Sequence, residues 1–127
     1  MSSKFATQRV EELQGDVEGV RYIGEKDNPD FANSWVNFGA GTEPAAFYKD
    51  KFSRVWLSGL INDGTVGVGS PVFTLPAGYR PNFINNFSTI DGTGTPSGRL
   101  AVLADGSLEI RAGSNTFISL DGFSWRV

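Results

Sequence analysis

The chain has 127 residues, which is the usual length of a single globular domain. Its 14 acidic residues outnumber 11 scattered basic ones, so the sequence shows no footprint for a nucleic-acid partner. It has no cysteine, no apolar run long enough to span a membrane and no signal-peptide core at its N-terminus. We therefore expect a chain made in the cytoplasm, without disulfides and without a membrane partner.

The N-terminal segment carries a heptad-like apolar pattern. Apolar side chains alternate at spacings of four and three at Ala6, Val10, Leu13, Val17 and Val20. The pattern favours a short docking or oligomerisation helix, but it covers only about two heptads, so a helix packed on its own domain and an extended arm stay open. Residues 25–30 favour a turn, because Pro29 restricts Asn28. We predict that residues 1–30 are a docking or oligomerisation arm with a linker.

From residue 33 onward the pattern is typical of β-strands. Short runs rich in β-branched and aromatic residues are bounded by Gly, Pro, Asn or Asp, and no βαβ pattern occurs. The predicted strands are residues 34–38, 46–49, 54–61, 71–75, 82–90, 99–104, 107–111, 116–120 and 123–127. We predict that residues 33–127 form an all-β head, an antiparallel β-sandwich or jelly roll.

The sequence RLAVLADGSLEIR predicts a β-hairpin. Asp105 and Gly106 suit the two positive φ angles of a two-residue type I′ turn. With Ala104 opposite Ser107, Leu103 would face Leu108 and Ala101 would face Ile110 on one apolar side. Val102 would then face Glu109, and Leu100 would face Arg111, on a wetter side.

The segment FTLPAGYRP, residues 73–81, predicts a rigid corner between two strands. Pro76 presets φ at the second position of a type I turn, and Gly78 suits the fourth position. Rigid loops present recognition residues well, so Tyr79 and Arg80 are candidates for contact with a ligand or a neighbouring subunit.

The sequence offers little for catalysis. Without His and Cys it cannot build the Ser-His-Asp and Cys-His constellations or the usual zinc sites, and its Asp-Gly pairs are typical of turns. We predict no enzymatic activity, no cofactor and no metal site. Aromatic residues are numerous and most should be core or subunit-interface residues, while an exposed subset such as Tyr48 or Tyr79 would suit stacking on a glycan.

The head resembles a known kind of virion protein. The segments, in chain order, are SWVNFGAG, AAFYKDKFSRVWLSGLI, PVFTLPAGYRP, GRLAVLADGSLEI and ISLDGFSW. They are similar to the C-terminal β domain of tail-fibre and minor tail proteins of tailed bacteriophages, especially those of actinobacteria. The resemblance runs from about Trp35 to Val127 and implies a virion surface protein, usually a homotrimer, with no catalytic motif carried over.

This resemblance leaves two locations open. Only some thirty residues precede the β domain, which favours a small anchor and hence a capsid decoration protein or short head fibre. The alternative is a tail-fibre or minor tail head that binds a host cell-surface glycan. The expected partners are other copies of this chain, phage capsid or tail proteins and, for the alternative, that glycan.

Overall fold

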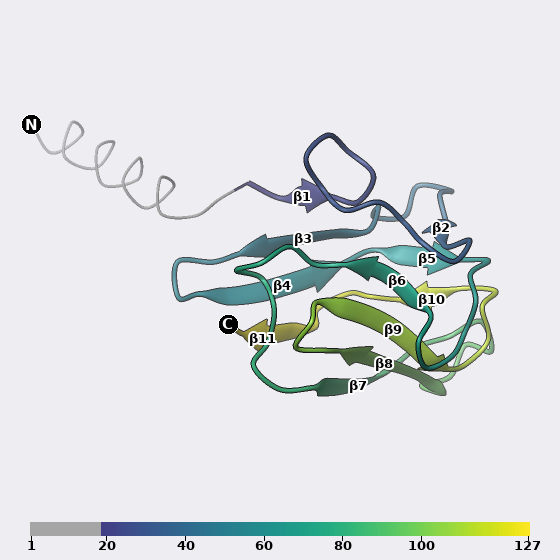
Figure 1. The fold of residues 1–127 in the computed structure, drawn as a ribbon. Helices are drawn as coiled ribbons and strands as arrows, with labels where there is room; N and C mark the ends of the chain where they lie inside the picture. Colours follow the sequence, from purple (N-terminus) through teal and green to yellow (C-terminus); the bar gives the residue numbers. More distant parts are fainter. Residues whose placement is uncertain (1–18) are drawn as a thin grey trace, which may run out of the picture.

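The computed structural model describes residues 19–127, and this part of the chain consists of strands, turns and loops without a helix. Accordingly, none of the described residues forms a helix that could cross a membrane. The strands, labelled in Figure 1, are β1 (Arg21–Tyr22), β2 (Val36–Asn37), β3 (Ala46–Lys49), β4 (Arg54–Ser58), β5 (Leu60–Asn62), β6 (Pro71–Thr74), β7 (Asn85–Thr89), β8 (Gly98–Val102), β9 (Ser107–Ala112), β10 (Ile118–Ser119) and β11 (Ser124–Arg126).

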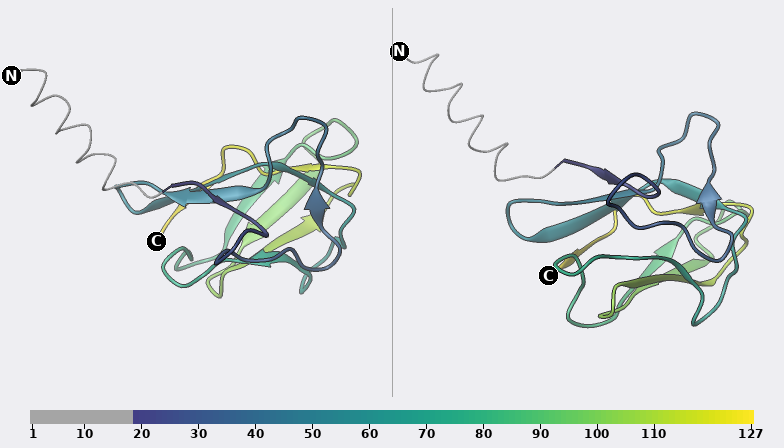
Figure 2. Two further views of the ribbon diagram at one scale, coloured as in Figure 1. Left: turned by 90° about the horizontal axis from the view of Figure 1, so that it is seen from above. Right: turned by 45° about the horizontal axis from the view of Figure 1, so that its top comes forward.

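Three antiparallel sheets form a two-layer sandwich. One layer contains the sheet β1-β3-β4-β11 and the small sheet β10-β5-β2, and the other is the sheet β6-β9-β8-β7. Figure 1 shows β3 and β4 above β9, β8 and β7, and the views in Figure 2 show the same two layers from other sides. The predicted all-β antiparallel sandwich is confirmed.

The core lies between the two layers and is rich in aromatic side chains. Phe47 of β3 stacks on Phe73 of β6, with ring centroids 6.4 Å apart. Tyr79 meets Phe47 edge-on at 5.2 Å, a geometry that aromatic pairs prefer. Trp35 and Trp125 are also fully buried. Five aromatic side chains are buried in this core and three more, Phe31, Phe87 and Phe123, pack against it, so about half of the aromatic residues in 19–127 have the predicted core role.

Some predicted strand boundaries agree with the structure and others do not. Residues 46–49 coincide with β3, but the predicted strand 54–61 is divided at Gly59 into β4 and β5. The Gly59 N–H donates to Asp121 Oδ1 at 2.7 Å instead of to a neighbouring strand. The structure also adds β1, which was not predicted. β1 pairs with β3, and Ile23 next to it is buried, so residues 21–23 of the predicted N-terminal arm contribute to the head.

The β8–β9 hairpin forms, but the predicted register is wrong by one residue. Val102 pairs with Leu108 and Leu100 pairs with Ile110, so these four side chains share the buried face, and Ala101 lies opposite Glu109 on the other face. The Leu103 N–H donates to Ser107 O and the Gly106 N–H donates to Leu103 O, both at 2.9 Å. Residues 104–106 therefore form a three-residue loop.

The turn type explains this error. Of the residues in the loop, only Gly106 has a positive φ, of 91°, and a type I′ turn needs a positive φ at Asp105 as well. A three-residue loop with one left-handed glycine is the common G1-bulge hairpin. The Asp105 carboxylate oxygen Oδ1 instead accepts the Ser107 N–H at 2.9 Å. Asp-Gly suits both turn types, so the dipeptide alone did not determine the register.

The corner at residues 73–81 is present, with its turn one residue later than predicted. The Tyr79 N–H donates to Pro76 O, so Pro76 occupies the first position of the turn and Gly78 the third. Gly78 has a φ of +92°, which is typical of the third position of a type II turn and not of a type I turn. The turn carries the chain from β6 toward β7 (Figure 1).

The predicted apolar seam of the N-terminal arm falls mostly outside the described residues. Ala6, Val10, Leu13 and Val17 lie before residue 19. Val20 is described, and 48% of it is exposed. The proposed arm and its role therefore stay a prediction.

Candidate functional site

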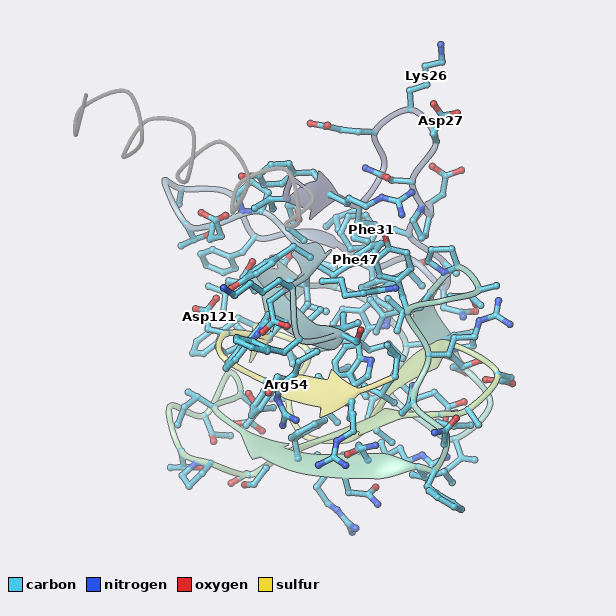
Figure 3. The ribbon with its side chains drawn as sticks, turned by 90° about the vertical axis from the view of Figure 1, so that its left-hand side faces the viewer. Lys26, Asp27, Phe31, Phe47, Arg54 and Asp121 are labelled. Atoms are coloured by element: carbon cyan, nitrogen blue, oxygen red, sulfur yellow. The ribbon has the colours of Figure 1, made fainter. Side chains whose placement is uncertain are left out.

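One end of the sandwich gathers three segments that are distant in sequence. Figure 1 shows the turn between β3 and β4, the end of β11 and the loop between β6 and β7 at the same end of the molecule. Figure 3 looks onto this end, with Arg54 beside β11. The strand pairing explains the proximity, because β11 pairs with β4 over Arg54–Arg126, Val55–Trp125 and Trp56–Ser124.

The pairing also determines which side chains share the outer face of this sheet. Val55 and Trp125 are buried, so they face the core, and the alternating side chains face outward. The outward cross-strand rows are Tyr48 with Trp56 and Ser124, and Arg54 with Arg126. Tyr48, one of the predicted ligand residues, thus shares this outer face with two arginines.

The β3–β4 turn is held by the carboxylate of Asp50. Its Oδ1 accepts the backbone N–H groups of Phe52 and Arg54 at 2.9 and 3.0 Å, and its Oδ2 accepts the Trp56 indole N–H at 2.9 Å. The Trp56 hydrogen bond, followed by that of the Arg54 backbone, holds the pKa of Asp50 below its usual value of 3.8. Asp50 therefore fixes the position of Arg54 at the start of β4.

A pocket of about 410 Å³ lies where this sheet meets the β6–β7 loop. We call it the Phe83 pocket. It is lined by Arg54, Asn82, Phe83, Ile84, Asn85, Trp125 and Arg126. Phe83 is 82% exposed and Ile84 is 51% exposed, although both are large apolar side chains. Exposed apolar groups rimmed by polar ones are typical of interaction sites.

The lining of the Phe83 pocket combines the groups that bind saccharides. An aromatic ring offers a flat apolar surface for the C–H face of a sugar, as Phe83 does here. The amides of Asn82 and Asn85 both donate and accept hydrogen bonds, and the guanidinium groups donate several each. The pocket therefore suits a ligand with one apolar face and many hydroxyl or anionic oxygens.

The other predicted ligand residues have mainly structural contacts. Tyr79 is only 9% exposed, and Lys49 Nζ lies 4.6 Å from the centre of its ring. The Tyr79 carbonyl oxygen accepts the Trp125 indole N–H at 2.8 Å. This hydrogen bond connects the corner to Trp125, which lines the Phe83 pocket. Arg80 Nε donates to Leu75 O at 2.9 Å and closes the corner from within.

Sequence reasoning missed the residues that define the pocket. Phe83 lies within the predicted strand 82–90, and most aromatic residues of such strands are predicted to be core or subunit-interface residues. The strand β7 begins only at Asn85, which leaves Phe83 and Ile84 in a loop. The signal that was available is the pair Pro81-Asn82, since a proline and an asparagine directly before an aromatic residue favour a loop over a strand.

A second depression, of about 660 Å³, lies beside the edge strands β1 and β2. It is lined by Tyr22, Ile23, Gly24, Glu25, Phe31, Val36, Asn37 and Pro44. These residues include one carboxylate and no basic side chain, and none of their aromatic rings is exposed to the extent of Phe83. Among residues 19–127 no group of carboxylates could hold a metal ion. The Phe83 pocket is therefore the stronger candidate site.

The comparisons with known proteins give one likeness. No protein-family model and no curated protein matches the sequence. The fold is similar to a solved structure, the receptor binding protein (gp15) of Listeria phage PSA, with a TM-score of 0.66. The match covers 98% of this chain and 74% of that chain at 16% sequence identity, so it is a likeness of fold.

Proposed function

We propose that this chain is a non-enzymatic, virion-associated head that binds a saccharide on the host cell surface through the Phe83 pocket. One observation carries the proposal: a strongly exposed aromatic ring lies among amide and guanidinium groups, on a fold shared with a phage receptor binding protein. The Trp125–Tyr79 hydrogen bond fixes the corner that leads into the Phe83 loop, and the Asp50 turn fixes the backbone of Arg54, so the pocket lies beside structured segments, which suits recognition.

Of the two locations that the sequence left open, the tail is the one that fits this proposal better. A fold shared with a receptor binding protein supports a host-binding tail head more than a capsid decoration protein. Homotrimerisation, attachment to tail proteins through the N-terminal arm and display on the virion surface belong to the same proposal. Three copies of the pocket would raise the apparent affinity for a repetitive surface polymer through avidity.

Binding of the fluorescently labelled full chain to host cells tests the proposal. We expect Phe83→Ala to reduce cell binding strongly while leaving the fold intact, because an exposed side chain contributes little to stability. Val68→Ala is the control, since Val68 is 75% exposed, lies in the β5–β6 connection and does not line the pocket. Equal cell binding by the wild-type chain and Phe83→Ala, or none by the wild-type chain, would overturn the proposed function.

A further inference from the structure

Two arginines lie directly opposite each other across the β4–β11 pair. Arg54 and Arg126 are cross-strand partners on the outer face, and both line the Phe83 pocket. Like charges in directly opposite positions destabilise an antiparallel pair. Among residues 19–127, neither arginine forms an ion pair, whereas Arg111 pairs with Glu109 at 2.8 Å. The fold therefore brings two positive charges together without neutralising them.

The carboxylate of Asp50, in the turn before β4, is already engaged. Both oxygens of Asp50 accept hydrogen bonds within the β3–β4 turn, and the charge of Arg54 is the least of the causes that lower the pKa of Asp50. Arg54 uses its Nε to donate to Ser124 Oγ at 2.8 Å, which orients its guanidinium along the strand pair. The terminal nitrogens of Arg54 and the whole guanidinium of Arg126 form no hydrogen bond to the described residues, so they are available to a ligand.

We infer that the Arg54–Arg126 pair is an anion subsite, and that the saccharide bound in the Phe83 pocket carries a phosphodiester or carboxylate group. This inference rests on the proposed function and specifies its ligand. Guanidinium groups bind such oxyanions by charge-assisted, often bidentate hydrogen bonds. The anionic group would neutralise both arginines, while the adjacent sugar ring contacts Phe83 and the two Asn side chains.

The decisive variant is Arg126→Gln, because Arg126 is exposed and its side chain forms no hydrogen bond or ion pair with residues 19–127. We expect it to weaken binding to an anionic glycan by roughly tenfold or more, as befits the loss of one charge-assisted contact. We also expect it to melt at the same or a higher temperature than the wild-type chain, because the repulsion from Arg54 is removed. A purely structural role for Arg126 would instead lower the melting temperature.

The binding assay compares three immobilised polymers with the full chain in solution: poly(glycerol phosphate), polygalacturonate and dextran. We expect binding to the phosphate or to the carboxylate polymer, which identifies the anionic group, and little binding to neutral dextran. The affinity should fall as NaCl is raised from about 50 to about 500 mM, because salt screens these exposed charges. Arg99→Gln is the matched control, since Arg99 is an exposed strand arginine on β8 that does not line the pocket.

The inference would be overturned by unchanged anionic binding in Arg126→Gln, by an equal loss in Arg99→Gln, or by dextran binding as strong as binding to both anionic polymers. Failure to bind either anionic polymer, with cell binding undiminished in Arg126→Gln, would also overturn it. The proposed function and the anion subsite can be disproved separately. If Phe83→Ala loses cell binding and Arg126→Gln keeps it, the head binds a neutral saccharide and only the anion subsite is wrong.

Discussion

The indole N–H of Trp125 donates to the carbonyl oxygen of Tyr79 at 2.8 Å, across 46 positions of sequence. This buried hydrogen bond joins the edge strand β11 to the corner that leads into the Phe83 loop. It therefore connects β11 to the chain segment that leads into residues 82–85, and both β11 and residues 82–85 line the Phe83 pocket. Both residues also belong to the core, so the site is built directly on the packed interior.

The first prediction concerns this hydrogen bond. Trp125→Phe should reduce the free energy of unfolding by about 2–4 kcal/mol, because it leaves the Tyr79 carbonyl without its indole donor and reduces the buried ring. Trp56→Phe is the control, since Trp56 also donates its indole N–H but is only half-buried, and it should cost less. Urea denaturation measures both. An equal or smaller loss in Trp125→Phe would contradict the anchoring role.

A second prediction tests the G1-bulge hairpin. Gly106→Val should cost at least about 2 kcal/mol, because a β-branched residue is strained at positive φ. A Cβ at Gly106 would also lie 2.6 Å from Leu75 O and from Arg80 Nε. Pro76→Ala should cost less than about 1 kcal/mol, mainly through the unfolded state. Thermal melts give the order, and the reverse order would be incompatible with the turn described here.

The third prediction concerns pH. The folded-state pKa of Asp50 is lowered, so its ionised form stabilises the fold above the usual carboxyl value of 3.8, and this stabilisation is lost as pH falls through the lowered folded value. Asp50→Asn should therefore melt below the wild-type chain at neutral pH, and the difference should shrink below about pH 4. Asp30→Asn is the control, because Asp30 is exposed. A constant difference between pH 7 and pH 2 would show that ionisation of Asp50 is irrelevant.

The N-terminal boundary provides a fourth prediction. Deleting residues 2–18 should leave the head folded, since all described strands remain. Deleting residues 2–24 should destabilise it, because it removes β1 and the buried Ile23. Loss of one buried isoleucine side chain alone costs about 2–5 kcal/mol. Equal melting temperatures for the two deletions would mean that β1 does not contribute to the head.

Oligomeric state is the fifth prediction. Light scattering of the full chain should report three copies, a prediction that rests on the heptad-like N-terminus and on the resemblance to tail-fibre heads. The chain lacking residues 2–18 should dissociate more readily, because it has lost most of the apolar seam. A monodisperse monomer of the full chain at micromolar concentration would exclude the trimer.

An element could be predicted correctly from sequence where its local pattern is compatible with a single structure. Residues 46–49, which include the aromatic pair Phe47-Tyr48, form β3 with the predicted bounds. Asp105-Gly106 marked a hairpin correctly but fits two loop lengths, and the structure has the three-residue loop that brings Leu100 and Val102 into the core. The two-residue strand β1 carries no pattern of its own, because its pairing depends on β3, which lies more than twenty residues later.

The site was harder to predict for the same reason. Arg54 and Arg126 are separated by 72 positions, and only the pairing of β4 with β11 places them opposite each other. The sequence predicts a strand at Phe83. The residue is exposed because β7 begins only at Asn85, which a short window of sequence does not show. Properties that arise from pairing between distant strands are not encoded in any short window of sequence.

The position of β1 has a mechanical consequence. β1 is an edge strand, and its ladder to β3 spans only the pairs Arg21–Phe47 and Tyr22–Ala46. A pulling force applied through residues that precede Gly19 would load these pairs in sequence, as in a zipper. We expect β1 to peel from β3 at low force, lengthening the tether while the sandwich stays folded. Single-molecule pulling would show this as a small extension before the main rupture. Release of β1 at low force would let the head reorient on a surface without detaching.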